Sequence, residues 1–318
     1  MLILKKNIFF SFLISQFILC SLNLFSQIEH RFNYYIPLDF QLNPAKIENN
    51  KNGIYFYHKN QWLKSFTSFR KFNSISGHYK LKDNFFIGGN LNSNKYSNSF
   101  MTNIFQLNGA WKGNLNDEND KYFSLGLGVK YYRMNYQPQD LIIFDNFDPQ
   151  FLNIEYKNKK TDFSSGIFFR FKSLKLSFAN TDLIGLVSKK QYNRNNEMIF
   201  EIGYLFNTTD NSDHYYDELT QINFRISKSE LYYEKISVDI NYDYYANQNY
   251  ALGVGIRQNF KNEFSFSTME SNALFFRVLF KLGKIQKFTC GLGYDVNTGM
   301  KSGYLPSSYD LLIGYQKE

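Results

Sequence analysis

The chain has 318 residues, of which 43% are hydrophobic, 19% aromatic and 20% charged, and its formal net charge is +8. The aromatic share comes mainly from Phe and Tyr, which favour β-strands, and this composition argues against a predominantly helical protein. The positive charge is not clustered as in a nucleic-acid-binding surface, so we expect no nucleic-acid partner. No change of composition typical of a linker divides the chain.

Residues 1–26 have the pattern of a secretory signal peptide. Two lysines lie near the start, an apolar core spans residues 8–19, and the small residue Ser26 ends the segment. Lipidation of Cys20 is less favoured, because the residue before it is a leucine where the lipid-attachment signal requires a small side chain. Removal of this segment leaves Cys290 as the only cysteine, which excludes an internal disulfide. No later segment has the run of about 18 apolar residues that a membrane helix needs.

The rest of the chain repeats a period of two between apolar and polar residues, which is typical of β-strands with two different faces. We predict about fourteen strands, an even number as in bacterial single-chain barrels. In the last one Leu312 is an exception, an apolar residue on the polar face. The predicted strands lie near residues 54–62, 68–79, 84–92, 100–112, 121–133, 163–171, 174–181, 197–207, 218–227, 235–244, 249–259, 272–282, 286–296 and 307–316.

Such alternation fits either a soluble β-sandwich with a dry core or a barrel with an apolar outer belt and a polar lumen. The length of the segments, their aromatic ends and the glycines on the polar face favour the barrel. We therefore predict an all-β fold, a transmembrane up-and-down antiparallel β-barrel over residues 54–318. It would lie in the outer membrane of a Gram-negative bacterium, in contact with outer-membrane lipid. Residues 27–53 would form an N-terminal periplasmic segment.

The predicted connections differ in length in a way that orients this barrel. If the chain starts in the periplasm, the short turns are periplasmic and the long segments face outward, as in outer-membrane barrels. The short turns are 80–83, 172–173, 245–248 and 283–285, and the long segments are 134–162, 182–196, 260–271 and 297–306. Two further turns, 113–120 and 208–217, are longer than this rule prefers.

The sequence offers no arrangement of residues typical of an enzyme, and we expect neither a catalytic site nor a cofactor. The four histidines are scattered without metal-ligand spacing, so no metal site is expected. An acidic stretch over residues 210–218 is better explained as a solvated turn than as a calcium loop. The charged residues expected on the inner face would line a pore or form a salt-bridged lumen; they are Lys130, Asp239, Asp243, Arg257 and Arg277.

Several short motifs occur in an order that resembles the PorP/SprF family of outer-membrane proteins associated with the type IX secretion system. After Gln27 and an aromatic-rich stretch comes an Asn-Pro-Ala element, then a strand that ends in Gln-Trp, and later an Asp-Pro-Gln-Phe stretch and a Gly-Leu-Gly-Tyr-Asp stretch. Where the family has a basic-acidic pair before Gln-Trp, this chain has His58-Lys59-Asn60. The residues that match the family motifs are Asn43, Pro44, Ala45, Gln61, Trp62, Asp148, Pro149 and Phe151.

This resemblance implies a non-enzymatic role in export or surface anchoring of a large secreted partner such as an adhesin, together with type IX secretion components. A passive porin or uptake channel is the alternative. The residues themselves give a local interpretation of the Asn-Pro-Ala element, because Pro44 disfavours the helical conformation at Asn43. This element would plug or brace the periplasmic mouth of the barrel, or form an ordinary turn before the first strand.

Overall fold

The computed structural model describes residues 35–46, 52–62, 69–82, 84–95, 100–115, 121–136, 156–183, 197–207, 219–229, 235–246, 250–261, 273–282, 288–297 and 308–317. The predicted signal peptide and the motif residues Asp148, Pro149 and Phe151 lie outside these ranges. No helix among the described residues is long and apolar enough to cross a membrane.

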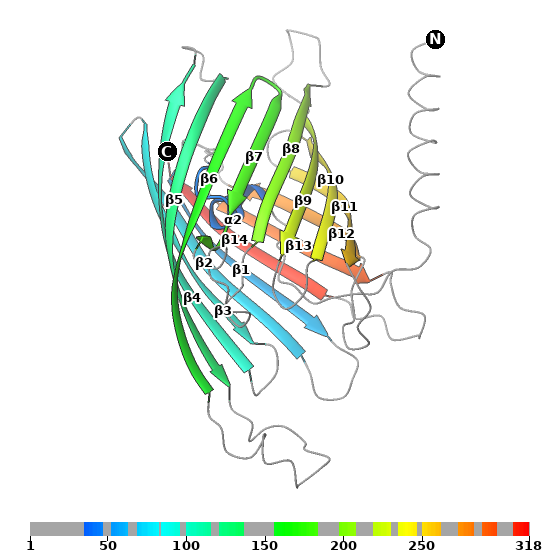
Figure 1. Ribbon diagram of the computed structural model, residues 1–318. Coiled ribbons are helices and arrows are strands. Elements are labelled where there is room, and N and C mark those ends of the chain that lie inside the picture. The colour runs from blue at the N-terminus through cyan, green and yellow to red at the C-terminus, as the bar shows by residue number, and fades with distance from the viewer. Residues whose placement is uncertain are drawn as a thin grey trace.

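Fourteen antiparallel strands form one closed barrel, in which each strand pairs with the strands before and after it in the chain (Figure 1). They are β1 (Asn52–Trp62), β2 (Phe69–Lys82), β3 (Phe85–Lys95), β4 (Phe100–Asn114), β5 (Lys121–Tyr136), β6 (Tyr156–Phe171), β7 (Leu174–Asn180), β8 (Glu197–Asn207), β9 (Leu219–Ser229), β10 (Lys235–Ala246), β11 (Tyr250–Lys261), β12 (Ala273–Leu282), β13 (Phe288–Asn297) and β14 (Ser308–Lys317). The predicted up-and-down barrel is confirmed.

Closure is achieved by the first and last strands, which pair over ten residues from Asn52 with Lys317 to Gln61 with Ser308. A single closed sheet has no unpaired edge, which is the condition for a sheet to lie in lipid. It also contradicts the alternative of a soluble β-sandwich, which requires two stacked sheets.

The two faces of the sheet differ as the alternation predicts. On β5, Leu125, Leu127 and Val129 point outward and are exposed, whereas Ser124 and Lys130 point inward and are buried. The five charged residues predicted on the inner face are all buried. The outer face therefore presents an apolar belt, and the inner face is predominantly polar.

The prediction was wrong about the start of β6. This strand begins at Tyr156, seven residues before the predicted start near 163, so part of the expected long segment 134–162 is strand. Residues 157–160 pair with Asn135 to Tyr132 of β5. The sequence over these residues, Lys-Asn-Lys-Lys, is polar at every position, and periodicity of hydrophobicity is absent beyond the apolar belt.

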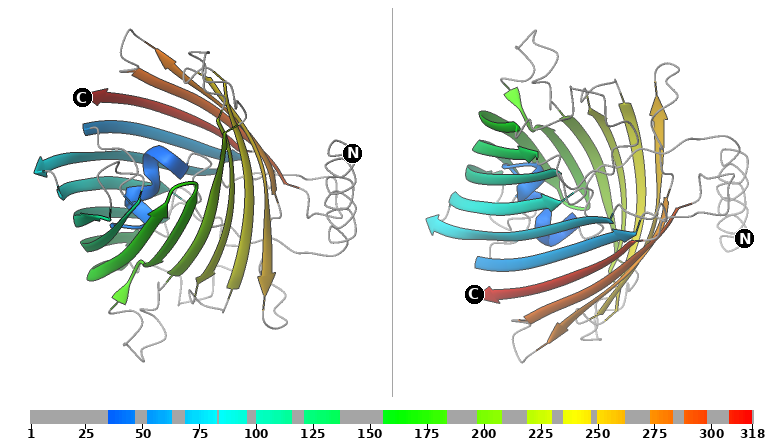
Figure 2. Two further views of the ribbon diagram at one scale, coloured as in Figure 1. Left: turned by 90° about the horizontal axis from the view of Figure 1, so that it is seen from above. Right: turned by 90° about the horizontal axis from the view of Figure 1, so that it is seen from below.

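Between the barrel walls lies α2 (Tyr35–Leu42), the helix that precedes β1 (Figure 2). In the two axial views it lies inside the ring of strands and not outside it. Helix formation here was not predicted. Pro37 occupies the first turn of the helix, where a missing backbone N–H costs no intrahelical hydrogen bond.

We expect a charge on the outer belt to destabilise the barrel according to its depth. Leu127 lies at the middle of the outward apolar row of β5 and is 68% exposed to the surroundings. Leu127→Arg should cost about 2–4 kcal/mol, because a cation at the bilayer midplane is that unfavourable.

The matched control is Thr161→Arg, at an exposed position on the neighbouring β6 beyond the last apolar residue Phe163. It should cost about 0–1 kcal/mol, as expected near the interface. Denaturant unfolding in lipid vesicles measures both values, and equal costs for the two variants would contradict the assignment of the outer face to lipid.

Candidate functional site

Residues 35–46, named here the lumen segment, comprise α2 and the turn that follows it. The last helical hydrogen bond runs from the backbone N–H of Asn43 to the carbonyl of Asp39 at 2.8 Å. Pro44 then ends the helix, and the side-chain oxygen of Asn43 accepts a hydrogen bond from the N–H of Ala45 at 2.8 Å. A side-chain hydrogen bond to the backbone two residues later is the turn that asparagine favours. The Asn-Pro-Ala sequence therefore both ends the helix and forms the turn that follows it.

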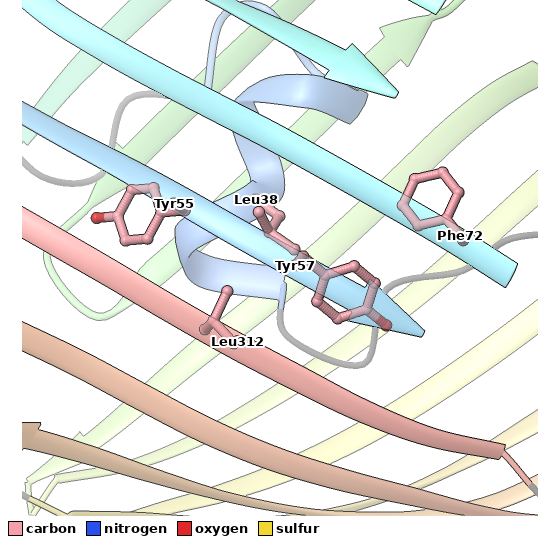
Figure 3. Close-up of a cluster of buried hydrophobic side chains, with 5 residues drawn as sticks. All are labelled: Leu38, Tyr55, Tyr57, Phe72 and Leu312. Atoms are coloured by element: carbon pink, nitrogen blue, oxygen red, sulfur yellow. The ribbon is translucent and has the colours of Figure 1, made fainter. Parts of the chain in front are cut away.

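Three apolar side chains fix the lumen segment to the wall. Leu38 packs into a buried cluster on β1, β2 and β14 (Figure 3), whose other members are Tyr55, Tyr57, Phe72 and Leu312. Phe40 packs against Phe86 and Ala110 of β3 and β4, and Ala45 packs with Tyr122 and Phe168 of β5 and β6. The apolar residues of these three clusters on the inner face, Leu312 included, therefore mark where the lumen segment binds.

Polar contacts fix the same segment between these apolar points. Gln41 donates to the hydroxyl of Ser74 on β2 at 2.9 Å, and Asn108 of β4 donates to the carbonyl of Phe40 at 2.8 Å. The hydroxyl of Ser124 on β5 donates to the carbonyl of Ala45 at 2.5 Å. One backbone carbonyl near the end of the helix and one in the turn are thus satisfied by side chains of the barrel wall.

Asn43 is the most extensively bonded residue of the turn. Its amide nitrogen lies 2.8 Å from the hydroxyl of Ser177, 3.3 Å from the carbonyl of Ile167 and 3.2 Å from the carbonyl of Phe178. Its side-chain oxygen accepts the hydrogen bond from the backbone N–H of Ala45 within the turn. An asparagine supplies both a donor and an acceptor at one position, which neither aspartate nor alanine would do.

Four buried charged groups join the lumen segment to the opposite side of the barrel. Lys46 lies 2.6 Å from Asp39 and 2.6 Å from Glu201 of β8. Arg225 of β9 lies 2.6 Å from Glu201 and 3.2 Å from Asp39. Each of the four side chains is at most 6% exposed. Two acids balance two bases, as burial of charge requires.

Close approach of the turn to the wall requires two glycines. A Cβ added at Gly126 of β5 would lie 2.2 Å from the carbonyl carbon of Pro44 and 2.3 Å from the nitrogen of Ala45. A Cβ added at Gly166 of β6 would lie 1.8 Å from the side-chain oxygen of Asn43. Any larger residue at these positions would exclude the turn from its site.

A second set of ion pairs lies on the inner wall away from the turn. Arg257 pairs with Asp239 at 3.1 Å, and Arg277 pairs with Asp243. Lys59 of β1 lies 2.6 Å from Asp295 of β13. Four of the five predicted inward charges thus form cross-strand ion pairs, which agrees with the second of the two alternatives, a salt-bridged lumen.

The structure places the family-motif residues in different parts of the barrel. Asn43, Pro44 and Ala45 are buried together in the lumen. Gln61 lies one residue before the end of β1 with a half-buried side chain, and Trp62 is the last residue of that strand. Neither takes part in the contacts of the turn given above. The Asp-Pro-Gln-Phe stretch lies outside the described residues.

Sequence reasoning missed the residues that hold the lumen segment, above all Leu38, Asp39 and Lys46. Two signals were available. Leu312 breaks the polar face of β14, and Glu201 lies directly opposite Arg225 in the pairing of β8 with β9. Neither signal identifies a partner, because the residues that meet are far apart in the chain; Asp39 and Arg225, for example, are separated by 186 positions.

We expect Gly126→Ala to displace the turn from the wall, because the nearest atoms are backbone and cannot move cheaply. Overpacking of this kind costs about 1–3 kcal/mol. The control is Gly109→Ala on the neighbouring β4, where an added Cβ meets nothing within 4 Å. Denaturant unfolding should show a lower stability for the first variant only; equal stabilities would mean that the turn is not held at this place.

The buried charges give a second prediction. Lys46→Met leaves Asp39 and Glu201 facing Arg225 alone, with one unbalanced negative charge, and should cost about 3–5 kcal/mol. The double variant Lys46→Met/Glu201→Gln restores the balance and should recover much of that loss. A double variant that is less stable than the single one, measured in the same unfolding assay, would refute the charge-balance explanation.

Comparisons with known proteins agree with this architecture. CymD, a monoaromatic hydrocarbon channel, has 9% sequence identity over 94% of this chain and 98% of its own, with a TM-score of 0.52. The Ralstonia pickettii toluene transporter TbuX has 8% identity over 92% of this chain and 96% of its own, with a TM-score of 0.49. The similarity to CymD concerns the barrel fold alone.

No curated relative matches the chain. The family model of the type IX secretion system membrane proteins PorP/SprF, in contrast, matches residues 24–315, which include the lumen segment and all but the end of the barrel. The resemblance inferred from the short motifs is confirmed over nearly the whole chain. The chain belongs to the PorP/SprF family of type IX secretion system membrane proteins.

Proposed function

We propose that this barrel lies in the outer membrane of a Gram-negative bacterium and assists export or surface anchoring of a large secreted partner such as an adhesin. It would act there with other type IX secretion components and without enzymatic chemistry. Membership of the PorP/SprF family supports the connection with secretion. The apolar outer belt supports contact with outer-membrane lipid.

The observation that carries the proposal is the lumen segment. Its contacts reach at least ten of the fourteen strands, from β14 through β1 to β9. A passive channel has no need of a segment fixed across its interior by four buried charges, whereas a barrel that presents a stable surface to a partner gains rigidity from one. The partner would then be engaged by the connections and the rim.

The orientation follows from the ends of the chain. The N-terminal segment 27–53 is proposed to start on the periplasmic side, with its part 35–46 inside the lumen, and β1 begins at the same end as the two-residue turn between β6 and β7. The longer connections at the opposite end would face outward, as in other outer-membrane barrels.

The motif residues divide between two proposed roles. Asn43, Pro44 and Ala45 would fix the lumen segment. Gln61 and Trp62, at the end of β1 where longer connections begin, would serve the outward side together with Asp148, Pro149 and Phe151. The sequence places these last three residues in one of the longer connections.

The secretion role is tested by deletion of the gene in its own strain, followed by proteomic measurement of the large surface proteins. We expect at least one such protein to be lost from the cell surface, and restored by the wild-type gene and by Gly109→Ala. Complementation with Gly126→Ala should restore it less well. Unchanged surface display of every large protein after deletion would refute the proposal.

A passive porin is the second candidate, and one observation favours it: the inner wall of β10 to β12 carries charged side chains such as Arg257 and Arg277, and a polar inner wall is typical of channel-forming barrels. Planar-bilayer recording separates the two functions. We expect the wild type to show no stable open-channel current. A stable current in the wild type, with surface proteins unaffected by the deletion, would establish the porin instead.

A further inference from the structure

A small cavity lies between the lumen segment and the barrel wall. Phe40 and Gln41 of α2 line one side of it, and residues of β2, β3 and β4 line the other. Ser76, His78 and Asn90 are among the lining residues of the wall. The volume of the cavity is about 10 Å³, which is close to the space that a single buried water molecule needs and too small for a larger ligand.

Several polar groups around this cavity already have partners in the protein. The side-chain nitrogen of Gln41 donates to the hydroxyl of Ser74 at 2.9 Å. The side-chain nitrogen of Asn108 donates to the carbonyl of Phe40 at 2.8 Å, and its side-chain oxygen accepts a hydrogen bond from Gln106, also at 2.8 Å. The amide of Asn108 is thus bonded at both its nitrogen and its oxygen.

Two other polar atoms of the lining differ in this respect. The hydroxyl oxygen of Ser76 and the side-chain oxygen of Asn90 are buried and have no hydrogen-bond partner within the described part of the chain. Ser76 is 7% exposed and Asn90 is 3% exposed. A buried oxygen without a partner is costly, and native proteins satisfy such groups with protein atoms or with ordered water.

The positions of these two atoms allow one small molecule to reach both. Ser76 of β2 lies directly opposite Asn90 of β3 in the pairing of the two strands, and residues in this relation have Cβ atoms about 5 Å apart. A third oxygen comes from the lumen segment. The side-chain oxygen of Gln41 lies 3.5 Å from the side-chain nitrogen of Asn90, which is too long for a strong hydrogen bond, so this oxygen can accept another.

We propose that this cavity binds one ordered water molecule, which connects the lumen segment to β2 and β3. The hydroxyl of Ser76 donates to the water, and the water donates to the side-chain oxygens of Asn90 and Gln41. Three hydrogen bonds are the usual number for a buried water. The helix α2 therefore contacts this part of the wall through water, whereas the turn that follows α2 contacts Gly126 and Gly166 directly.

A metal cation fits the same oxygens less well. None of the described residues that line the cavity is acidic, so a buried cation would have no counter-charge there. Three side-chain oxygens are also fewer than the six or more that a calcium ion takes. Water is neutral and both donates and accepts hydrogen bonds, which is what a hydroxyl and two amide oxygens require.

The first test counts the long-lived water molecules of the full barrel in detergent by magnetic relaxation dispersion of water. Ser76→Val removes the hydroxyl and places methyl groups in the cavity, so this variant should hold one long-lived water fewer than the wild type. The matched control is Ser237→Val at a fully buried, inward serine of β10, whose hydroxyl lies 3.5 Å from the carbonyl of Gln258. The control should keep the wild-type number.

The second test needs no variant and is a crystal structure of the wild-type barrel at a resolution that shows ordered water. We expect a density peak within hydrogen-bond distance of Ser76, Asn90 and Gln41. The absence of such a peak, or a peak surrounded by six or more oxygens at the distances of a metal ion, would overturn the proposal. The same holds for an unchanged water count in Ser76→Val, or for an equal loss in the control. Neither test depends on the secretion role, which is read from surface proteins after gene deletion.

Discussion

The structure depends on one constraint: in lipid, each backbone N–H and C=O must find its hydrogen-bond partner within the protein. The chain meets it by pairing β1 with β14, which leaves the sheet without an edge. Closure separates an outer face from an inner one, and successive residues of each strand then belong to the two faces in turn. The apolar belt and the polar lumen are both consequences of this closure, because the same alternation supplies each.

A polar lumen creates a second requirement, which the lumen segment helps to meet. Charged groups such as Glu201 and Arg225 are shielded from water and need partners, and Asp39 and Lys46 complete a balanced set with them. Apolar contacts around Leu38 add stabilisation without further charge. The segment is therefore an integral part of the barrel interior, although it contributes no strand.

The inner and outer faces of the barrel have different proposed roles. The inside is occupied by a fixed element, which favours a structural or partner-binding role over free passage of solutes, in keeping with the type IX secretion family. The outside presents an apolar belt, which supports contact with lipid.

By itself, the sequence determined the number of strands, their order, the phase of nearly every one and five of the inward charges, because alternation is local and reports which side a residue faces. It did not reveal the first seven residues of β6, of which six are polar, nor the helix before β1. Only the tertiary structure decided that Asn43-Pro44-Ala45 lies within the lumen and that Lys46 meets Glu201, 155 residues away. Such contacts form when the barrel closes and brings distant strands around one segment, and no local pattern records which of them will meet.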